Sequence, residues 1–275
     1  MIDLHSHTLH SDGERSPAEL LAEAAAAGIQ VLSVTDHDTV AGIGECAAAA
    51  AQVGIRLIPG IELSCQLHGR EVHILGHLLD PASPGLLRLA AGMMAERRER
   101  MVRMIDRARE AGLSGITLEK VAAYGGGENF GRPHLARALV AAGHATSVKD
   151  VFDRLLHSRG PLFVDRHRLS VREATDLVHA AGGTASVAHP GANQISQHEL
   201  KGMAGEGLDA VEALHPEHVP SQAEAYQRWG EALGLLVTAG SDFHGPRVQP
   251  GRKLGDRSLA PERLAALEER AARYR

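Results

Sequence analysis

Seven short apolar runs recur along this chain of 275 residues, and stretches with helical periodicity lie between most of them. Runs that are apolar throughout are typical of strands buried on both faces, as in a parallel sheet. Strands that alternate with helices predict an α/β fold, and seven strands favour a barrel over an open sheet. The runs occupy residues 1–4, 29–35, 55–63, 71–79, 183–189, 208–214 and 234–240.

Two of the stretches between the runs carry helix-capping signals. Ser16 precedes Pro17, and Glu19 stands three residues after the serine, which is the pattern of a capping box. The stretch 170–182 also begins with serine and ends with glycine, as capped helices do. A βα unit is therefore predicted at both places.

The alternation of strand and helix stops between residues 84 and 168. Residues 86–112 show the pattern of one long helix, whose Glu–Arg pairs at i,i+4 favour a solvated face over a nucleic-acid surface. Shorter helical patterns separated by glycines follow. We expect a barrel formed by residues 1–83 and 169–275, with residues 84–168 as a helical insertion that contributes to substrate binding.

The composition argues against several classes of protein. A net charge of −5 provides no global positive field for long nucleic acid. Two cysteines, Cys46 and Cys65, are too few for a disulfide scaffold or a thiolate zinc site. No apolar run reaches the ~18–20 residues of a membrane span, and the first residues lack a signal-peptide pattern. We expect a cytoplasmic protein without a membrane association, and no protein partner is implied.

Histidines and carboxylates stand at the ends of the apolar runs. Carboxyl ends of parallel strands share one face, so these groups are expected to converge on a single pocket. His5 and His7 are two residues apart on a strand, so they point the same way and can hold one ion. Imidazole and carboxylate together suit divalent metals, and a carboxylate such as Glu62 can span two ions. The predicted ligands are His5, His7, Asp12, His37, Glu62, His73, His189, Asp242 and His244.

Six motifs in this chain resemble those of the PHP (polymerase and histidinol phosphatase) superfamily, in the usual order. The resemblance covers roughly residues 1–80 and 169–245 and implies a distorted (β/α)7 barrel with two or three divalent ions. Manganese is the first expectation, with zinc, iron or magnesium as alternatives. The motifs are DLHSHTLHSDG, VTDHD, PGIELS, VHILGH, AHPG and GSDFHG.

The resemblance also implies how the ligands are shared. The first ion would be held by His5, His7, Glu62 and Asp242. Glu62 would bridge to a second ion held by His73 and His189. A third ion would be held by Asp12, His37 and His244. Many members have histidine where this chain has Asp12, so a carboxylate there implies a weaker site or a preference for a harder metal at the third position.

A further motif narrows the resemblance. GRPHLARALV in the insertion resembles the branch of nucleoside 3′,5′-bisphosphate phosphatases. This resemblance implies hydrolysis of the 3′-phosphate, for example of adenosine 3′,5′-bisphosphate to AMP and phosphate. Some members of the branch trim short RNA from the 5′ end, so a 5′→3′ exoribonuclease stays as an alternative. Another PHP phosphatase activity, such as histidinol phosphatase, stays open as well.

The expected chemistry needs cations for the phosphate and a proton for the leaving oxygen. Arg132 and His134 from the insertion are predicted to contact phosphate, and Ser11 with Arg15 form a second possible clamp. The sequence does not single out one proton donor, and the candidates for base stacking are the aromatic residues Tyr124, Phe130 and Phe163. The three candidates for proton donor are Asp36, His215 and His218.

Two other classes of protein share some of these features. A non-catalytic metal-binding module predicts damaged ligands, whereas all nine predicted ligands are present. A metal-dependent amidase also uses His-x-His at its first strand, but that group usually carries a metal-bridging lysine at a later strand end. No run in this chain ends in such a lysine.

Overall fold

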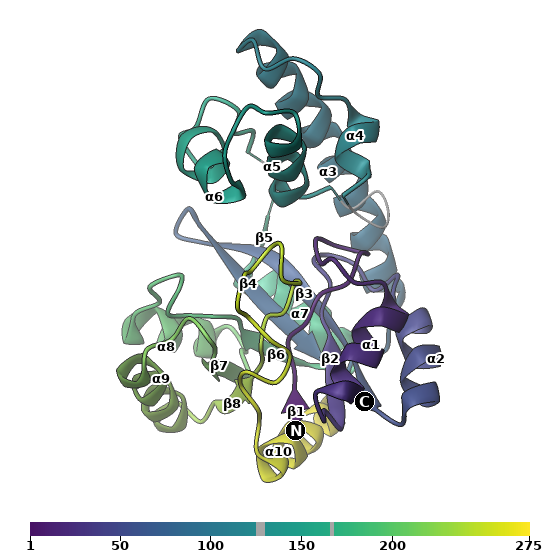
Figure 1. The fold of residues 1–275 in the computed structure, drawn as a ribbon. Helices are drawn as coiled ribbons and strands as arrows, with labels where there is room; N and C mark the ends of the chain where they lie inside the picture. The colour runs from purple at the N-terminus through teal and green to yellow at the C-terminus, as the bar shows by residue number, and fades with distance from the viewer. Residues whose placement is uncertain (125–129, 166–167) are drawn as a thin grey trace.

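The computed structural model describes residues 1–124, 130–165 and 168–275, and its strands form one nearly closed, barrel-like sheet (Figure 1). The strands follow the order β1–β2–β3–β4–β6–β7–β8, and β5 pairs with β3. Across the seam between β1 and β8, the amide of Leu4 donates to the carbonyl of Ala239 over 3.1 Å. The strands are β1 (Ile2–Asp3), β2 (Val31–Val34), β3 (Arg56–Leu67), β4 (Arg70–His77), β5 (Leu169–Ser170), β6 (Thr184–Val187), β7 (Ala210–Leu214) and β8 (Leu236–Ala239). The predicted α/β barrel is confirmed.

Helices cover the outside of this sheet and are joined to it by the predicted caps. The Ser16 hydroxyl accepts from the amide of Glu19, and the glutamate side chain accepts from the serine amide, which completes the capping box. The same box forms at Ser170 and Glu173. The barrel helices are α1 (Pro17–Ala26), α2 (Ile43–Val53), α7 (Val171–Ala180), α8 (Gln197–Gly205), α9 (Pro220–Ala232) and α10 (Pro261–Ala271), followed by the 3₁₀ turn η2 (Ala272–Tyr274).

One strand departs from the parallel pattern that the apolar runs suggested. β4 runs antiparallel to both β3 and β6, because the two residues between β3 and β4 form a tight turn. His68 and Gly69 in this turn have φ of +49° and +77°, as a type I′ hairpin turn requires. β3 therefore continues to Leu67, and Glu62 lies in the middle of this strand instead of at its end.

Because β4 runs in the reverse direction, a residue in the amino-terminal half of this strand lies at the site. In an antiparallel strand, the amino-terminal end lies at the edge where the parallel neighbours have their carboxyl ends. His73 pairs in register with Ser64 of β3 and lies just beyond the stretch that pairs with β6. It therefore stands at the same edge as the ends of β1, β2, β6 and β8.

The insertion folds as a helical layer beyond the carboxyl edge of the sheet, at the top of Figure 1. It has an apolar cluster of its own, which includes Met101, Leu135, Leu139, Val151 and Leu156. The predicted long helix is present as α3. The helices are α3 (Pro84–Glu110), α4 (Leu118–Ala122), α5 (Arg132–Ala141) and α6 (Val148–Val151), which continues as the π-helical turn η1 (Phe152–Leu156). Within the described residues, none of the helices combines the length and apolar character that crossing a membrane requires.

Candidate metal centre

The nine predicted ligands come together at the carboxyl edge of the sheet. Their side-chain nitrogen and oxygen atoms form three overlapping groups, in each of which the atoms lie within 4.8 Å of one another. His189 joins them, because its Nε2 lies 3.1 Å from Oε1 of Glu62. The three groups are His7–Asp12–His37–His244, His5–His7–Asp242 and His37–Glu62–His73.

Glu62 occupies the centre of this arrangement, with histidines around each of its two oxygens. Oε2 lies 3.1–3.3 Å from nitrogens of three histidines, which are His5, His7 and His37. Oε1 lies 2.8 Å from Nδ1 of His73 and 3.1 Å from Nε2 of His189. Each oxygen thus faces its own set of imidazoles, which is the geometry of a carboxylate that spans two cations.

Several buried polar atoms in the cluster face one another without forming a well-aligned hydrogen bond among the described residues. Buried polar groups are nearly always paired in folded proteins, so orphaned atoms that face one another call for an explanation. Imidazole nitrogens and carboxylate oxygens are also the donors that first-row divalent metals take. The residues present therefore fit bound divalent ions. The orphaned atoms include His5 Nε2, His7 Nε2, Asp12 Oδ1, Glu62 Oε2 and His73 Nδ1.

The electrostatics of the cluster favour ionised carboxylates. Burial opposes ionisation of Glu62, but His37, His73 and His5 outweigh it and hold its pKa well below the ordinary value. Burial likewise opposes ionisation of Asp12, and His244 and His37 hold its pKa well below the ordinary value. Burial lowers the pKa of His37 to about 3, so that imidazole is neutral near pH 7. These are the protonation states in which the groups bind metal.

Two other histidines of the cluster have pKa values that neighbouring carboxylates raise. Burial lowers the pKa of His73, but Glu62 and Glu71 outweigh this effect and raise it to about 10. For His7, contacts with Asp242 and Glu62 outweigh burial and raise the pKa to about 9. These protons compensate the buried carboxylates, and a bound cation would replace them.

Glu212 holds two of the predicted ligands from behind, and the sequence analysis did not identify it. Nδ1 of His5 donates to its Oε1 over 2.9 Å, and the backbone amide of His189 donates to its Oε2 over 2.7 Å. A carboxylate behind a metal-binding histidine fixes the tautomer and the ring orientation. The sequence does contain a signal that could have identified this residue. Glu212 stands inside an apolar run, where a charged side chain is rare.

The backbone at the site is constrained as well. His189 and Asp242 have φ of +29° and +51°, in the left-handed region that side chains other than glycine rarely adopt. Gly240 packs against the first strand so closely that an added Cβ would lie 2.3 Å from Cβ of His5. Strained backbone of this kind concentrates at functional sites, where the surrounding structure maintains it.

The three candidates for proton donor have different surroundings. Asp36 accepts from the amide and hydroxyl of Thr8 and from the hydroxyl of Ser11, so it organises the loop that carries Asp12. His218 uses both ring nitrogens on the backbone, where Nδ1 donates to Ala213 and Nε2 accepts from the amide of Gly191. Both arrangements favour a structural role.

His215 differs from the other two candidates. Its Nδ1 accepts from the amide of Glu217 over 3.2 Å, which leaves the proton on Nε2. Nε2 faces Oδ2 of Asp242 over 3.4 Å, and the ring lies 5.5 Å from that of His189. Of the three, His215 is therefore the one whose ring proton faces the metal centre.

The residues predicted to contact phosphate lie in different surroundings in the structure. Arg132 lines a cavity at the mouth of the metal centre, whereas Ser11 and Arg15 do not. Ser11 is buried and donates to Asp36, and Arg15 pairs with Glu23 of α1 over 2.7 Å. Nδ1 of His134 accepts a hydrogen bond from the amide of Gly131 at the start of α5. Burial lowers the pKa of His134 to about 4, so the imidazole is a neutral helix cap and not a cation.

This mouth cavity measures about 110 Å³ and lies between the metal centre and the insertion. Phe152 forms part of its wall, and the Arg132 guanidinium lies 5.8 Å from the ring centroids of both Phe152 and Phe163. Phe130, by contrast, is buried in the apolar cluster of the insertion. The cavity is lined by Asp12, His37, Glu71, His73, Arg97, Arg100, Gly131, Arg132, Pro133 and Phe152.

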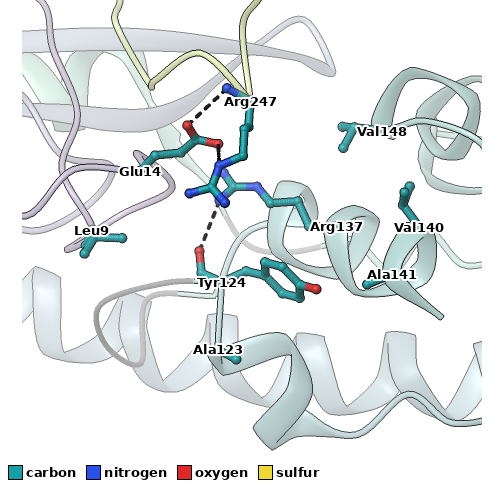
Figure 2. Close-up of a pocket in the computed structure, with 9 residues that line it drawn as sticks. All are labelled: Leu9, Glu14, Ala123, Tyr124, Arg137, Val140, Ala141, Val148 and Arg247. Atoms are coloured by element: carbon teal, nitrogen blue, oxygen red, sulfur yellow. Dashed lines mark hydrogen bonds and ion pairs between the residues drawn. The ribbon is translucent and has the colours of Figure 1, made fainter.

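A larger cavity of about 420 Å³ lies beside the loop that carries Asp12 (Figure 2). Tyr124 lines it, together with aliphatic side chains of α5 and α6. Arg137 donates to the carbonyl of Tyr124 over 3.1 Å and to the carbonyl of Asp12 over 2.6 Å. The arginine thus ties the insertion to the loop of a predicted ligand.

Comparisons with known proteins agree with this geometry. Residues 3–99 match the PHP domain. A 5′-3′ exoribonuclease of Haemophilus influenzae is 35% identical over 251 residues, which are 89% of this chain and 90% of that protein. A 3′,5′-nucleoside bisphosphate phosphatase of Chromobacterium violaceum is 33% identical over 265 residues, which are 92% and 90% of the two proteins. A solved structure from Bifidobacterium adolescentis, described as a metal-dependent phosphoesterase, has a TM-score of 0.89 at 32% identity and covers 98% of this chain and 95% of that chain.

Proposed function

The chain belongs to the PHP domain family, and we propose that it is a metal-dependent phosphoesterase that removes the 3′-phosphate from nucleoside 3′,5′-bisphosphates. The observation that carries this proposal is the position of Glu62, whose two oxygens each face a separate set of imidazoles. Two cations that share one carboxylate are typical of enzymes that transfer phosphoryl groups. The bisphosphate phosphatase of Chromobacterium violaceum, which matches nearly the whole chain, supports the choice of substrate.

The proposed ligand assignment follows the contacts in the cluster. Around Oε2 of Glu62, the first ion would take His5, His7 and Asp242. Around Oε1, the second would take His73 and His189. The third would take Asp12, His37 and His244, because Nε2 of His244 lies 3.2 Å from Oδ1 of Asp12. We propose manganese as the metal, as the resemblance to the PHP superfamily implies, and the three carboxylates of the set are ligands that manganese takes.

In the proposed reaction, side chains of this chain have separate roles. Divalent ions bound at these positions would lower the pKa of water to about 7 and offset the charge of a phosphate group. Glu212 keeps Nε2 of His5 turned toward the cluster by accepting the proton on Nδ1. Arg132 provides a fixed cation at the mouth cavity. His215 donates its Nε2 proton to the ribose oxygen as that oxygen leaves phosphorus.

A substrate panel tests the proposal. Metal-loaded protein is expected to release phosphate from adenosine 3′,5′-bisphosphate with a kcat/KM at least about tenfold above that for 5′-AMP or histidinol phosphate. Glu62→Gln should abolish most of this activity, whereas the exposed Glu231→Gln should not change it. Equal kcat/KM values for the bisphosphate and 5′-AMP would overturn the assignment. Elemental analysis of protein purified without added metal tests the choice of manganese.

A second candidate function is 5′→3′ trimming of short RNA. It is favoured by the exoribonuclease of Haemophilus influenzae, which is 35% identical to this chain. A 5′-phosphorylated RNA trimer that is degraded faster than the free bisphosphate is hydrolysed would establish this activity as the principal one. Release of phosphate from the bisphosphate without cleavage of the trimer would exclude it.

A further inference from the structure

We propose that Arg252 is a positioning residue of the candidate metal centre, and that it turns the carboxylate of Asp242 so that one oxygen is presented to the first ion. This inference rests on the proposed function, because it takes Asp242 as a ligand of that ion. Arg252 lies ten residues after Asp242, in the loop that connects β8 with α10. It is therefore outside the motifs that contain the predicted ligands.

The two carboxylate oxygens of Asp242 have different neighbours. Oδ1 lies 3.4 Å from a ring nitrogen of each of three histidines, which are His5, His7 and His244. Oδ2 instead accepts a hydrogen bond from Nη1 of Arg252 over 2.7 Å. Because a carboxylate is planar and rigid, a bond that fixes Oδ2 also fixes the position of Oδ1. An outer partner of this kind orients a metal ligand without contacting the metal.

Arg252 also contacts the backbone of Asp242. Its Nη1 donates to the carbonyl of Asp242 over 3.3 Å, so one nitrogen holds both the side chain and the main chain of the same residue. Asp242 has φ of +51°, and a residue in this rare conformation needs contacts that maintain it. The side chains of Arg252 and Asp242 are only 10% and 11% exposed, so water competes little for this charge-assisted bond.

Glu217 holds the other terminal nitrogen of the arginine. Nη2 of Arg252 donates to Oε1 of Glu217 over 2.7 Å. A carboxylate on each terminal nitrogen leaves the planar guanidinium little freedom to rotate. Glu217 also balances the positive charge of Arg252, which would otherwise repel a cation bound beside Asp242. We therefore expect orientation of the ligand to outweigh repulsion of the ion.

His215 is the other neighbour of Oδ2, but its contact is longer. Its Nε2 lies 3.4 Å from this oxygen, whereas Nη1 of Arg252 lies 2.7 Å away. Only the second distance is within the range of about 2.7–3.2 Å that is typical of N–H···O hydrogen bonds. Arg252 is therefore the principal partner of Oδ2.

Direct binding of substrate is the alternative role for an arginine near the ions. Both terminal nitrogens of Arg252 donate to carboxylates. Within the described part of the chain, the arginines that line the mouth cavity are Arg97, Arg100 and Arg132. These contacts favour a positioning role for Arg252, and the two roles predict different kinetics.

Manganese affinity tests the positioning role without turnover. Arg252→Met keeps much of the side-chain length but removes the fork, so competition with a chromophoric chelator should show an affinity for manganese about tenfold or more below that of the wild type. Arg252→Lys should lie between the two, because one ammonium group lacks the two separate nitrogens that hold Asp242 and Glu217. Arg257→Met, at an exposed arginine in the same loop, is the matched control and should bind manganese as the wild type does.

Kinetics with added manganese separate positioning from substrate binding. In Arg252→Met, the manganese concentration that gives half-maximal activity should rise about tenfold or more. At saturating manganese, KM for adenosine 3′,5′-bisphosphate should stay within about twofold of the wild-type value, because a residue that acts through Asp242 does not contact the substrate.

The outcomes that count against this role are distinct. Equal manganese affinity in Arg252→Met and the wild type would overturn it, and a higher affinity in Arg252→Met would show that the arginine only repels the ion. A KM that remains raised at saturating manganese would assign Arg252 to substrate binding instead. Failure of the wild type to bind either manganese or zinc would overturn the proposed metal centre and this role together. Arg252→Lys serves the same comparison if Arg252→Met does not fold, since its affinity should also lie below that of the wild type.

Discussion

Glu212 lies directly behind His5, and its Oε1 accepts the Nδ1 proton of that histidine over 2.9 Å in the fully buried interior of the barrel. Burial opposes ionisation of Glu212, but His5 outweighs it and lowers the pKa of the carboxyl to about 2. The ionised carboxylate fixes which nitrogen of His5 carries the proton, and therefore which nitrogen faces the metal cluster.

Replacing this carboxylate should weaken metal binding. Glu212→Gln keeps the size of the side chain but loses the charge that orients His5, so the affinity for the tightest ion should fall about 10- to 100-fold. Competition with a chromophoric chelator measures this affinity. Glu231→Gln, an exposed glutamate on α9, should leave it unchanged. An affinity equal to that of the wild type in Glu212→Gln would show that His5 keeps its orientation without the glutamate.

His215 should matter most when the leaving oxygen needs a proton. For His215→Asn we expect kcat on the 3′-phosphate of a ribonucleotide to fall about 100-fold, the scale of general acid catalysis. The same variant should hydrolyse p-nitrophenyl phosphate nearly as well as the wild type, because that leaving group departs without protonation. His198→Asn, an exposed histidine, is the control. An equal loss on both substrates would assign His215 to binding or structure instead.

Removal of metal should lower the stability of the fold. Ions that bind only the folded chain add about 2.7 kcal/mol to the free energy of unfolding when their concentration is 100 times Kd. A chelator should therefore lower Tm, and added manganese should restore it. Glu62→Gln should gain less from manganese than the wild type does, because its side chain no longer carries the shared charge. If Tm of both proteins rose equally with manganese, Glu62 would not be a shared ligand.

Asp209 should link stability to pH at the opposite end of the barrel. It is buried, and it accepts from His179 over 2.7 Å, from Tyr274 over 2.7 Å and from Arg270 over 3.2 Å. Burial opposes its ionisation, but the bonds from His179, the amide of Ala185 and Tyr274 outweigh it and lower the pKa below the ordinary value of 3.8. A depressed pKa stabilises the fold fully above pH 3.8, and this contribution is lost as the pH falls through the folded-state value.

The variant Asp209→Asn tests this linkage. At pH 7 its free energy of unfolding should be about 3 kcal/mol lower, because a buried partner of charged groups has lost its charge. Below about pH 4 the difference between the two proteins should shrink, since the wild-type carboxylate becomes protonated there. Urea unfolding at pH 7, 4 and 3 measures the difference. A difference that stays constant over this range would contradict the assigned pKa direction.

Most of the strands, and the meeting of the nine candidate ligands at one edge of the sheet, could be predicted because their signals are local. Buried strands are short and apolar, capped helices begin with serine, and ligands such as His5 and His189 stand at the ends of the runs. The long helix could be predicted for the same reason, from the periodicity of its apolar positions. These features depend on a few neighbouring residues, which a single sequence displays.

The remaining features depend on contacts between distant parts of the chain. The reversal of β4 follows from the turn at His68 and Gly69, where only glycine is a familiar turn residue. The meeting of Glu71 with Arg168 joins residues 97 positions apart, and the bond between His5 and Glu212 spans 207. No local pattern encodes such pairs, so the sequence could not show that Arg15 pairs with Glu23 while Arg132 lines the mouth cavity.

The reversal of β4 also sets the length of α3. A strand that starts at the site ends at the far rim of the barrel, so the chain must return along the outside of the barrel before it can cover the candidate metal centre (Figure 1). The 27 residues of α3 span about 40 Å, enough for that return and for the insertion beyond it. The length of α3 therefore sets the distance between the barrel and the rest of the insertion. A helix one turn longer would place the insertion about 5 Å farther from the nine candidate ligands, which all lie in the barrel.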